Sequence, residues 1–346
     1  MFPMKKIKNI AIAGATGFSG IELIKILLKH PYVRIKYLFA QSNTGKPMSF
    51  FDKDFKNIKL PLVSKFNSEA IQEVDTIFTA LPHGESHFIS NVMNSKTTLI
   101  DLSADFRLDD KNIFQTWYKT EHKSVKNQKK AVYGLSEINR KNISKTNIIA
   151  CPGCYPTSIL LPLIPLIKRN MINANTIKAD SKSGYSGAGK KIYDKKLYPN
   201  NIYENIGIYG VAKHRHMPEI DQELSKFSKK KIQISFTPHI IPTFRGMIST
   251  IYVDLNKNFN DKKIYKYLLN YYKKDKFVKI FNNNVMINTD AVINTNSCHI
   301  GIYNNRFKGQ LIIASAIDNL VKGAAGQAVQ NFNIKYKFKE DLALKA

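Results

Sequence analysis

The chain has 346 residues, of which 43% are hydrophobic and 11% aromatic, and it carries a formal net charge of +27. This length is sufficient for two domains with a sizeable core, and the composition is that of a soluble globular protein rather than a disordered one. No apolar stretch reaches the roughly 20 residues that a membrane-spanning helix needs, and no signal-peptide pattern precedes the first strand, so we expect a cytoplasmic protein without a membrane partner.

The positive charge comes mostly from lysines, which are scattered from Lys5 to Lys345 rather than gathered in one stretch. Nucleic-acid binding would require a basic face with interleaved aromatic residues, so we expect no nucleic-acid partner, although the field would attract small anions. The three cysteines, Cys151, Cys154 and Cys298, are too few for a disulfide framework or a zinc site, and no metal is expected.

The first part of the chain alternates between strand-like and helix-like runs. Apolar runs of strand length occupy 7–13, 34–40, 74–82 and 97–104, and apolar residues at helical spacing occupy 21–30. This alternation predicts an α/β fold whose N-terminal part is a Rossmann domain with a doubly wound parallel sheet.

A glycine-rich turn joins the first strand to the first helix. Gly14 suits the tight turn, Gly17 lets the backbone approach a pyrophosphate, and Gly20 allows the helix to pack closely on the strand. This variant of the dinucleotide fingerprint predicts a cofactor site at Gly14, Thr16, Gly17 and Gly20.

The segment after the second strand refines the cofactor. An NAD site usually places a carboxylate there to bind the ribose 2′-hydroxyl, whereas residues 40–46 of this chain are AQSNTGK. No acidic group is present to repel a 2′-phosphate, and hydroxyl groups and a lysine are available to bind one. We therefore predict NADPH/NADP, with Ser42 among the contacts.

The second half has a different pattern. Residues 119–130 form a polar, charged segment that predicts a loop. Strand-like runs follow at 177–189, 231–244, 246–255, 285–305 and 309–318, and helical patterns at 261–276 and 319–336. The alternation predicts a C-terminal α+β domain with a mixed, mostly antiparallel sheet. We expect residues 1–153 and 318–346 to bind NADP and residues 154–317 to form the catalytic and dimerisation domain.

Cys154 follows a Pro-Gly turn and opens an apolar run that predicts a helix. Pro156 and Thr157 suit its first turn, and a thiol at a helix N-terminus is favoured as the thiolate by unpaired N–H groups and the dipole. Cys154 is thus a candidate nucleophile. A redox pair with Cys151 is an alternative interpretation.

The run His214-Arg215-His216-Met217-Pro218-Glu219 supplies candidate acid/base groups. In an extended segment both imidazoles would share one face, whereas at a helix start they would diverge and only one could reach the thiol. The sequence leaves open which of His214 and His216 does so.

Two further segments are candidate anion sites. The loop 183–190, SGYSGAGK, could form a nest of backbone N–H groups with Lys190, or be a mobile surface loop. Arg245 follows an apolar strand and suits a carboxylate or phosphate, or a plain surface ion pair.

With these motifs in view, the chain resembles the N-acetyl-gamma-glutamyl-phosphate reductases, relatives of aspartate-semialdehyde dehydrogenase. The resemblance spans essentially the whole chain in family order, through GATGFSGIELIKILLKHP, ALPHGES, IDLSADFRL, YGLSE, PGCYPT, SGYSGAG, HRHMPEI, FTPHIIPTFRG and KGAAGQAVQNFN. The pair PGCYPT and HRHMPEI is highly specific.

The resemblance implies that Cys154 attacks the acyl phosphate of N-acetyl-L-glutamyl 5-phosphate, that NADPH reduces the resulting thioester, and that the product is N-acetyl-L-glutamate 5-semialdehyde, in arginine biosynthesis. It implies acid/base roles for His216, or alternatively His214. A homodimer or homotetramer is expected, with the antiparallel sheet as subunit interface.

The resemblance also assigns supporting residues. It implies substrate contacts by Arg245, Arg107 and Glu219, the last of which would orient the histidines. Ser183, Gly184, Gly187 and Asn331 are expected at the cofactor, with Asn331 beside the nicotinamide.

Three residues depart from the family pattern: Cys151 stands where Asn is usual, and Ser158 and Pro162 replace small residues. None removes the nucleophile, but Cys151 raises the possibility of oxidative pairing with Cys154. Alternative functions are a sister enzyme acting on aspartyl phosphate or carrier-bound aminoadipyl phosphate, an inactive dinucleotide-binding protein and a basic nucleic-acid-binding protein.

Overall fold

The computed structural model describes residues 6–193 and 204–346, which form two compact units. Of the described residues, unit 1 comprises those up to 152 together with 324–344, and unit 2 comprises those between 153 and 323 together with 345–346. In the part of the chain that the structure describes, no helix is long and apolar enough to cross a membrane.

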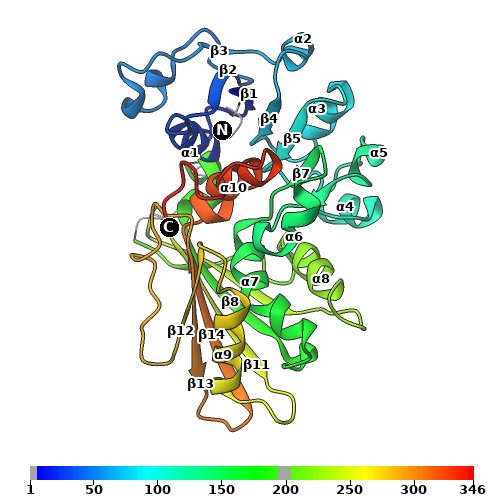
Figure 1. Ribbon diagram of the computed structural model, residues 1–346, viewed down its shortest axis with the longest axis vertical. Helices are drawn as coiled ribbons and strands as arrows, with labels where there is room; N and C mark the ends of the chain where they lie inside the picture. The colour runs from blue at the N-terminus through cyan, green and yellow to red at the C-terminus, as the bar shows by residue number, and fades with distance from the viewer. Residues whose placement is uncertain (1–5, 194–203) are drawn as a thin grey trace, which may run out of the picture. The chain divides into compact units, whose positions relative to one another are not determined.

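Unit 1 is built on a parallel sheet, of which Figure 1 labels β1 to β5 and β7. The strand order is β3-β2-β1-β4-β5-β7-β6. Its strands are β1 (Lys8–Ala13), β2 (Val33–Phe39), β3 (Val63–Ser64), β4 (Thr76–Thr79), β5 (Thr98–Asp101), β6 (Val132–Tyr133) and β7 (Ile148–Ala150). The helices are α1 (Phe18–Leu27), α2 (Ser68–Ile71), α3 (Ser86–Val92), α4 (Lys111–Tyr118), α5 (Val125–Gln128), α6 (Ser136–Ile143) and α10 (Gly326–Lys335), with short 3-10 turns at Met48–Phe50 and Lys53–Phe55. The predicted doubly wound parallel sheet is confirmed.

The core of unit 1 follows from the alternation of side chains along the buried strands. Ala11 and Ala13 of β1 pack with Ile71 of α2 and Ile89 of α3 in one apolar cluster. On the C-terminal helix, α10 packs against α1 and α6, and its Phe332 ring lies 5.8 Å from that of Phe78.

Unit 2 contains a mixed sheet with strand order β12-β13-β14-β11-β8-β10-β9. Its strands are β8 (Lys178–Gly184), β9 (Gly207–Ile208), β10 (Ser235–Ile241), β11 (Met247–Asp254), β12 (Val278–Phe281), β13 (Cys298–Asn304) and β14 (Gln310–Ile317). The helices are α7 (Cys154–Lys168), α8 (Met217–Ser225) and α9 (Asp261–Tyr271), with 3-10 turns at Ala174–Thr176 and Tyr185–Tyr193, and a π-helical segment, Val321–Ala325, leads toward α10. The β10–β8 and β12–β13 pairs are parallel and the other strand pairs antiparallel, which confirms the predicted α+β class.

Two local predictions were wrong. The segment 119–130 includes the short helix α5, and its His122, Ser124 and Gln128 are buried, because their polar groups find partners such as the Leu108 carbonyl for the Gln128 amide. In 285–305 only Cys298–Asn304 forms a strand, because the residues before it fold as turns that pack Ile287 and Val292 onto the sheet.

Candidate active site

Cys154 is the first residue of α7, and its thiol is partly buried. The preceding Gly153 has extended backbone angles (φ −66°, ψ 160°) and forms the N-cap. Both the backbone N–H and the hydroxyl of Thr157 donate to the Gly153 carbonyl, each at 2.9 Å, which closes the first turn. The thiol therefore lies at the positive end of a fifteen-residue helix.

A buried carboxylate holds the residue before the thiol. The Gly153 N–H donates to Oε1 of Glu219 at 2.9 Å, and Glu219 lies in the first turn of α8 with no exposed surface. The backbone at Gly323 approaches from another direction, since an ideal Cβ there would lie 2.7 Å from the Cys154 Cβ. These contacts from α8 and from the segment after β14 fix the turn that presents Cys154.

The two histidines lie together beside this turn. His216 is the N-cap residue of α8, and its ring packs on Gly153 so closely that an added Cβ would lie 2.4 Å from Nε2. The His214 and His216 ring centroids are 4.8 Å apart, so the two rings lie together although His216 is the N-cap of α8. The reason is local: the His216 N–H donates to Nδ1 of His214 at 3.2 Å in the turn before α8, which draws the rings together.

His214 occupies an aromatic pocket. Its ring makes edge contacts at 5.4 Å with each of Tyr155, Tyr209 and Phe236. Burial, reinforced by the neighbouring Arg215 charge, lowers the pKa of His214 to about 4, so its imidazole is neutral at pH 7. The ring that faces the Cys154 turn is that of His216, and this geometry favours His216 over His214 as the partner of the thiol.

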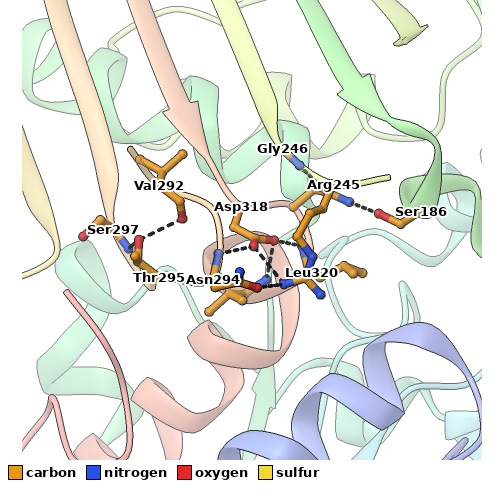
Figure 2. Close-up of polar contacts among 11 residues, drawn as sticks. Ser186, Arg245, Gly246, Val292, Asn294, Thr295, Ser297, Asp318 and Leu320 are labelled. Atoms are coloured by element: carbon orange, nitrogen blue, oxygen red, sulfur yellow. Dashed lines mark hydrogen bonds and ion pairs between the residues drawn. The ribbon is translucent and has the colours of Figure 1, made fainter. Parts of the chain in front are cut away.

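Arg245 is anchored to a buried carboxylate (Figure 2). Its Nη1 donates to Oδ2 of Asp318 at 3.1 Å and to Oδ1 of Asn294 at 2.5 Å. Asp318 has no exposed surface, and its other oxygen accepts the N–H of Leu320 at 2.8 Å. The side chain of Arg245 is 16% exposed, so this is not a plain surface ion pair. The Asp318 and Asn294 oxygens thus fix the orientation of the guanidinium.

The glycine-rich segment 183–187 lies against the segment that carries Arg245. The backbone N–H groups of Gly184, Tyr185 and Ser186 donate to carbonyls of residues 243–246 at 2.8–3.0 Å. These three groups are thus already bonded and do not form the anion nest suggested by the sequence. Asn319 ties the two segments together, because its amide donates to the Ser186 hydroxyl and accepts the Gly246 N–H, both at 2.8 Å.

Ser183 and Gly187 lie in the same glycine-rich segment. An ideal Cβ at Gly187 would lie 3.2 Å from the Ser183 hydroxyl oxygen, and the Ser183 hydroxyl donates to the Gly184 carbonyl at 3.1 Å. Cofactor contacts by Ser183, Gly184 and Gly187 stay a prediction.

A buried chain of serine hydroxyls lies under the first turn of α7. Ser158 bonds the Tyr155 carbonyl at 3.0 Å and the Ser249 hydroxyl at 2.7 Å, and Ser249 bonds Ser181 at 2.7 Å. All three serines have no exposed surface. The residue that departs from the family pattern at 158 therefore connects α7 to β11 and β8, which the sequence did not indicate.

In unit 1 the glycine turn has the geometry that a dinucleotide site needs. Gly14 has φ +83°, and an added Cβ would lie 2.2 Å from the Ala80 carbonyl oxygen. A Cβ at Gly20 would lie 2.2 Å from the Gly14 carbonyl oxygen, while Gly17 is the open N-cap of α1. Thr16 lies in the turn between them.

A cavity of about 500 Å³ opens beside this turn. We call it the glycine-turn cavity; its lining includes Gly14, Gln41, Lys65, Phe66, Glu85 and Phe88. The absent Cβ at Gly14 and this volume fit the adenosine end of a dinucleotide. Ser42 is an exposed residue of the next loop and is not part of the lining.

Arg107 and Cys151 form a buried pair at the end of β7. Nε of Arg107 donates to the Cys151 carbonyl and Nη2 to the Leu102 carbonyl, both at 2.8 Å. Burial raises the pKa of the Cys151 thiol to about 12, so it stays protonated, which disfavours the thiolate that a redox pair with Cys154 would use. The substrate role of Arg107 stays a prediction.

Asn331 of α10 is fully buried, and its amide is engaged within unit 1. Its Nδ2 donates to the Gly134 carbonyl at 2.8 Å, and its Oδ1 accepts the Ser136 hydroxyl at 2.8 Å. These bonds fix α10 to the turn before α6. A place beside the nicotinamide stays a prediction for this residue.

Sequence reasoning missed a pair of buried acids, Asp101 and Asp105, in the IDLSADFRL motif. Asp105 accepts the N–H groups of Gly84 and Ser86 at 2.6 and 2.8 Å, which orders the turn before α3. Burial and the nearby Asp101 raise the pKa of Asp105 to about 7. The spacing of Asp101, Ser103 and Asp105 in this motif is the signal that could have indicated the network. Among the described residues, no group of three or more histidine, cysteine or acidic side chains could hold a metal ion.

Comparisons with known proteins cover both units. Residues 9–146 match the family model "Semialdehyde dehydrogenase, NAD binding domain", and residues 154–319 match "Semialdehyde dehydrogenase, dimerisation domain". The chain is 43% identical over 345 residues to the N-acetyl-gamma-glutamyl-phosphate reductase of Thermoanaerobacter pseudethanolicus, covering 97% of both chains. It is 41% identical to the probable chloroplastic N-acetyl-gamma-glutamyl-phosphate reductase of Arabidopsis thaliana, covering 99% of this chain and 85% of that protein.

Solved structures agree on the fold. Aspartate semialdehyde dehydrogenase II from Vibrio cholerae matches with a TM-score of 0.71 at 19% identity, covering 96% of this chain and 99% of that one. Aspartate semialdehyde dehydrogenase with NADP from Candida albicans matches with a TM-score of 0.67 at 15% identity, covering 95% and 98%. At these identities the likeness concerns the fold alone.

Proposed function

The chain belongs to the N-acetyl-gamma-glutamyl-phosphate reductases of the semialdehyde dehydrogenase family, and from this premise we propose that it reduces N-acetyl-L-glutamyl 5-phosphate to N-acetyl-L-glutamate 5-semialdehyde with NADPH, in arginine biosynthesis. The observation that carries the chemistry is the placement of Cys154 at the N-terminus of α7 with the His216 imidazole against its N-cap. A thiol there meets a positive helix end and a proton acceptor together.

In the first step the Cys154 sulfur attacks the acyl carbon of the substrate. A carbon–sulfur bond forms, the carbon–oxygen bond to phosphate breaks, and inorganic phosphate leaves, so that the acyl group is held as a thioester. His216 takes the thiol proton before the attack, since its ring packs on Gly153 directly beside the nucleophile. Glu219 holds the Gly153 N–H and so keeps the nucleophile's turn in place.

In the second step the thioester becomes an aldehyde. The chemistry that NADPH supplies when bound is a hydride, which reduces the acyl carbon. The carbon–sulfur bond then breaks, Cys154 leaves as the thiolate, and the semialdehyde is released. The α7 dipole and the His216 imidazolium stabilise that thiolate again.

The supporting residues divide between substrate and cofactor. Arg245, oriented by Asp318, suits the substrate anion, and Arg107 is a second candidate. The glycine turn and the cavity beside it support cofactor binding by Gly14, Thr16, Gly17 and Gly20 in unit 1. We assign residues 1–153 and 318–346 to cofactor binding and 154–317 to catalysis and subunit contact.

A homo-oligomer is supported by the dimerisation-domain match of residues 154–319. We propose a homodimer or homotetramer whose interface uses the exposed face of the mixed sheet. The three cysteines are all free thiols, which fits a reducing compartment such as the cytoplasm.

The test runs the reaction in reverse, with N-acetyl-L-glutamate 5-semialdehyde, phosphate and NADP⁺, and follows cofactor reduction. We expect turnover by the wild type and by Cys298→Ser, a matched control at a fully buried cysteine of β13, and loss of turnover in Cys154→Ser. Equal rates in Cys154→Ser and wild type would refute the thioester mechanism. Faster turnover of aspartate 4-semialdehyde, or of a carrier-bound aminoadipate semialdehyde, would reassign the substrate to a sister enzyme.

A further inference from the structure

The end of β2 lacks the charged group that discriminates between NAD and NADP in Rossmann domains. That group is usually an acid for the ribose 2′-hydroxyl or a nearby cation for the 2′-phosphate. Here β2 ends at Phe39 and is followed by Ala40 and Gln41, both of which line the glycine-turn cavity. Neither side chain is charged, so a cation would have to come from another element.

The lysine nearest in sequence is directed elsewhere. Lys46 ends the loop after β2, and its ammonium lies 5.4 Å from the centroid of the Phe50 ring. Lys46 is not among the residues that line the cavity. The loop around it is held by β3, since the Gly45 N–H donates to the Val63 carbonyl at 2.7 Å and the Val63 N–H to the Lys46 carbonyl at 3.0 Å.

Lys65 reaches the cavity from the neighbouring strand. Phe39 pairs with Ser64 in the parallel β2–β3 register, and the Ala40 N–H donates to the Ser64 carbonyl at 3.0 Å. Lys65, the first residue after β3, therefore lies beside Ala40, the first residue after β2. Within the described residues its ammonium makes no hydrogen bond or ion pair.

The one carboxylate among the described lining residues enters from a different place. Glu85 follows β4, and the sheet order β3-β2-β1-β4 separates β3 from β4 by three strand spacings. At about 4.8 Å each, these spacings put the two strands about 14 Å apart. The acid thus lies on the β4 side of the cavity and the lysine on the β2–β3 side.

An aromatic platform lies next to the lysine. The Phe66 ring packs edge-on against that of Phe88, with centroids 5.7 Å apart, and both line the cavity. Phe88 of α3 is 58% exposed. A purine base could stack on such a ring and cover it.

We propose that Lys65 is the residue that selects NADP over NAD, by binding the 2′-phosphate while the adenine lies against Phe66 and Phe88. This deepens the proposed function, on whose choice of cofactor it rests. The Lys65 ammonium acts as a point charge that attracts the 2′-phosphate, and the neutral Gln41 after β2 does not repel it.

The experiment measures binding rather than turnover. The full-length protein is titrated calorimetrically with 2′,5′-ADP, which carries the 2′-phosphate, and with 5′-AMP, which lacks it. We expect wild type to prefer 2′,5′-ADP, and Lys65→Gln to lose about 10-fold to 100-fold in affinity for 2′,5′-ADP with 5′-AMP unchanged. Lys46→Gln is the matched control and should leave both affinities unchanged, whereas Phe88→Ala should weaken both probes by a similar factor.

Several results would overturn the proposal: no preference in the wild type, no binding of either probe, an unchanged preference in Lys65→Gln, or a lost preference in Lys46→Gln. Because Lys65 is exposed, its replacement should leave the melting temperature unchanged. The readout is independent of the reaction. A protein that fails to turn over N-acetyl-L-glutamate 5-semialdehyde yet shows the Lys65-dependent preference would refute the proposed function alone.

Discussion

Gly153→Ala tests the contact between the nucleophile's turn and His216 by adding a single methyl group. The added Cβ would lie 2.4, 2.7 and 2.8 Å from Nε2, Cε1 and Cδ2 of the His216 ring. For the added Cβ and Nε2 to reach an ordinary separation of about 3.5 Å, the ring or the turn has to move by about 1 Å. The ring has little room to retreat, because Tyr155 and His214 flank it with centroids at 5.8 and 4.8 Å.

The backbone itself accepts alanine, since Gly153 has φ −66° and ψ 160°. The substitution is therefore a steric probe without backbone strain, and overpacking should cost about 1–3 kcal/mol of unfolding free energy. Misplacement of a catalytic group by about 1 Å can lower the rate by about 100-fold, so we expect kcat/KM to fall by about that factor.

The assay is cofactor reduction with the semialdehyde and phosphate, together with the pH dependence of Cys154 alkylation. Gly207→Ala is the control, because its added Cβ would meet only Ile240 at an ordinary 3.7 Å. If Gly153→Ala kept kcat/KM and the alkylation profile of the wild type while folding normally, the inferred partnership of His216 and the thiol would be wrong.

Three further predictions concern the surroundings of the site. Asp318→Ala removes the buried partner of Arg245. We expect this variant to lower the unfolding free energy, measured by urea denaturation, by about 3 kcal/mol and to raise KM for the substrate. An unchanged KM would count against Arg245 as substrate ligand. The pKa of His214 is about 4 in the folded state, below its ordinary value of about 6.5. Between these pH values the unfolded chain binds more protons than the folded one, so the unfolding free energy falls as the pH drops from 6.5 to 4. This residue accounts for at most about 3 kcal/mol of that fall. His214→Phe should flatten that part of the stability profile relative to wild type, and parallel profiles would contradict the buried neutral state. Ser158→Ala should cost about 1 kcal/mol, since Ser249 keeps its bond to Ser181, and a double variant with Ser249→Ala should lose less than the sum of the single losses if the hydroxyls act as one chain.

The sequence by itself determined the classes of the two units and the place of the candidate nucleophile at the start of a helix. Strand length, apolar spacing and the glycine turn are local properties, so they indicated the parallel sheet around β1 and the helix that begins at Cys154. The apolar periodicity also located α1, α9 and the helical C-terminal tail, because helix and strand periods differ within a few residues.

Only the tertiary structure decided which side chains meet. His214 and His216 are two residues apart, and the turn before α8, not the pattern, placed the second ring on Gly153 and the first among aromatic side chains. Lys65 belongs to no motif that the sequence shows, because its place beside the end of β2 depends on the pairing of β2 with β3, strands that are distant in sequence. Likewise, the sequence allowed an anion nest or a surface loop at 183–190, and the pairing with 243–246 showed the N–H groups of residues 184–186 bonded to carbonyls. Periodicity is set by neighbouring residues, whereas hydrogen-bond partners and ring contacts are set by long-range packing, and for that reason the fold class could be predicted from the sequence and the arrangement of the site could not.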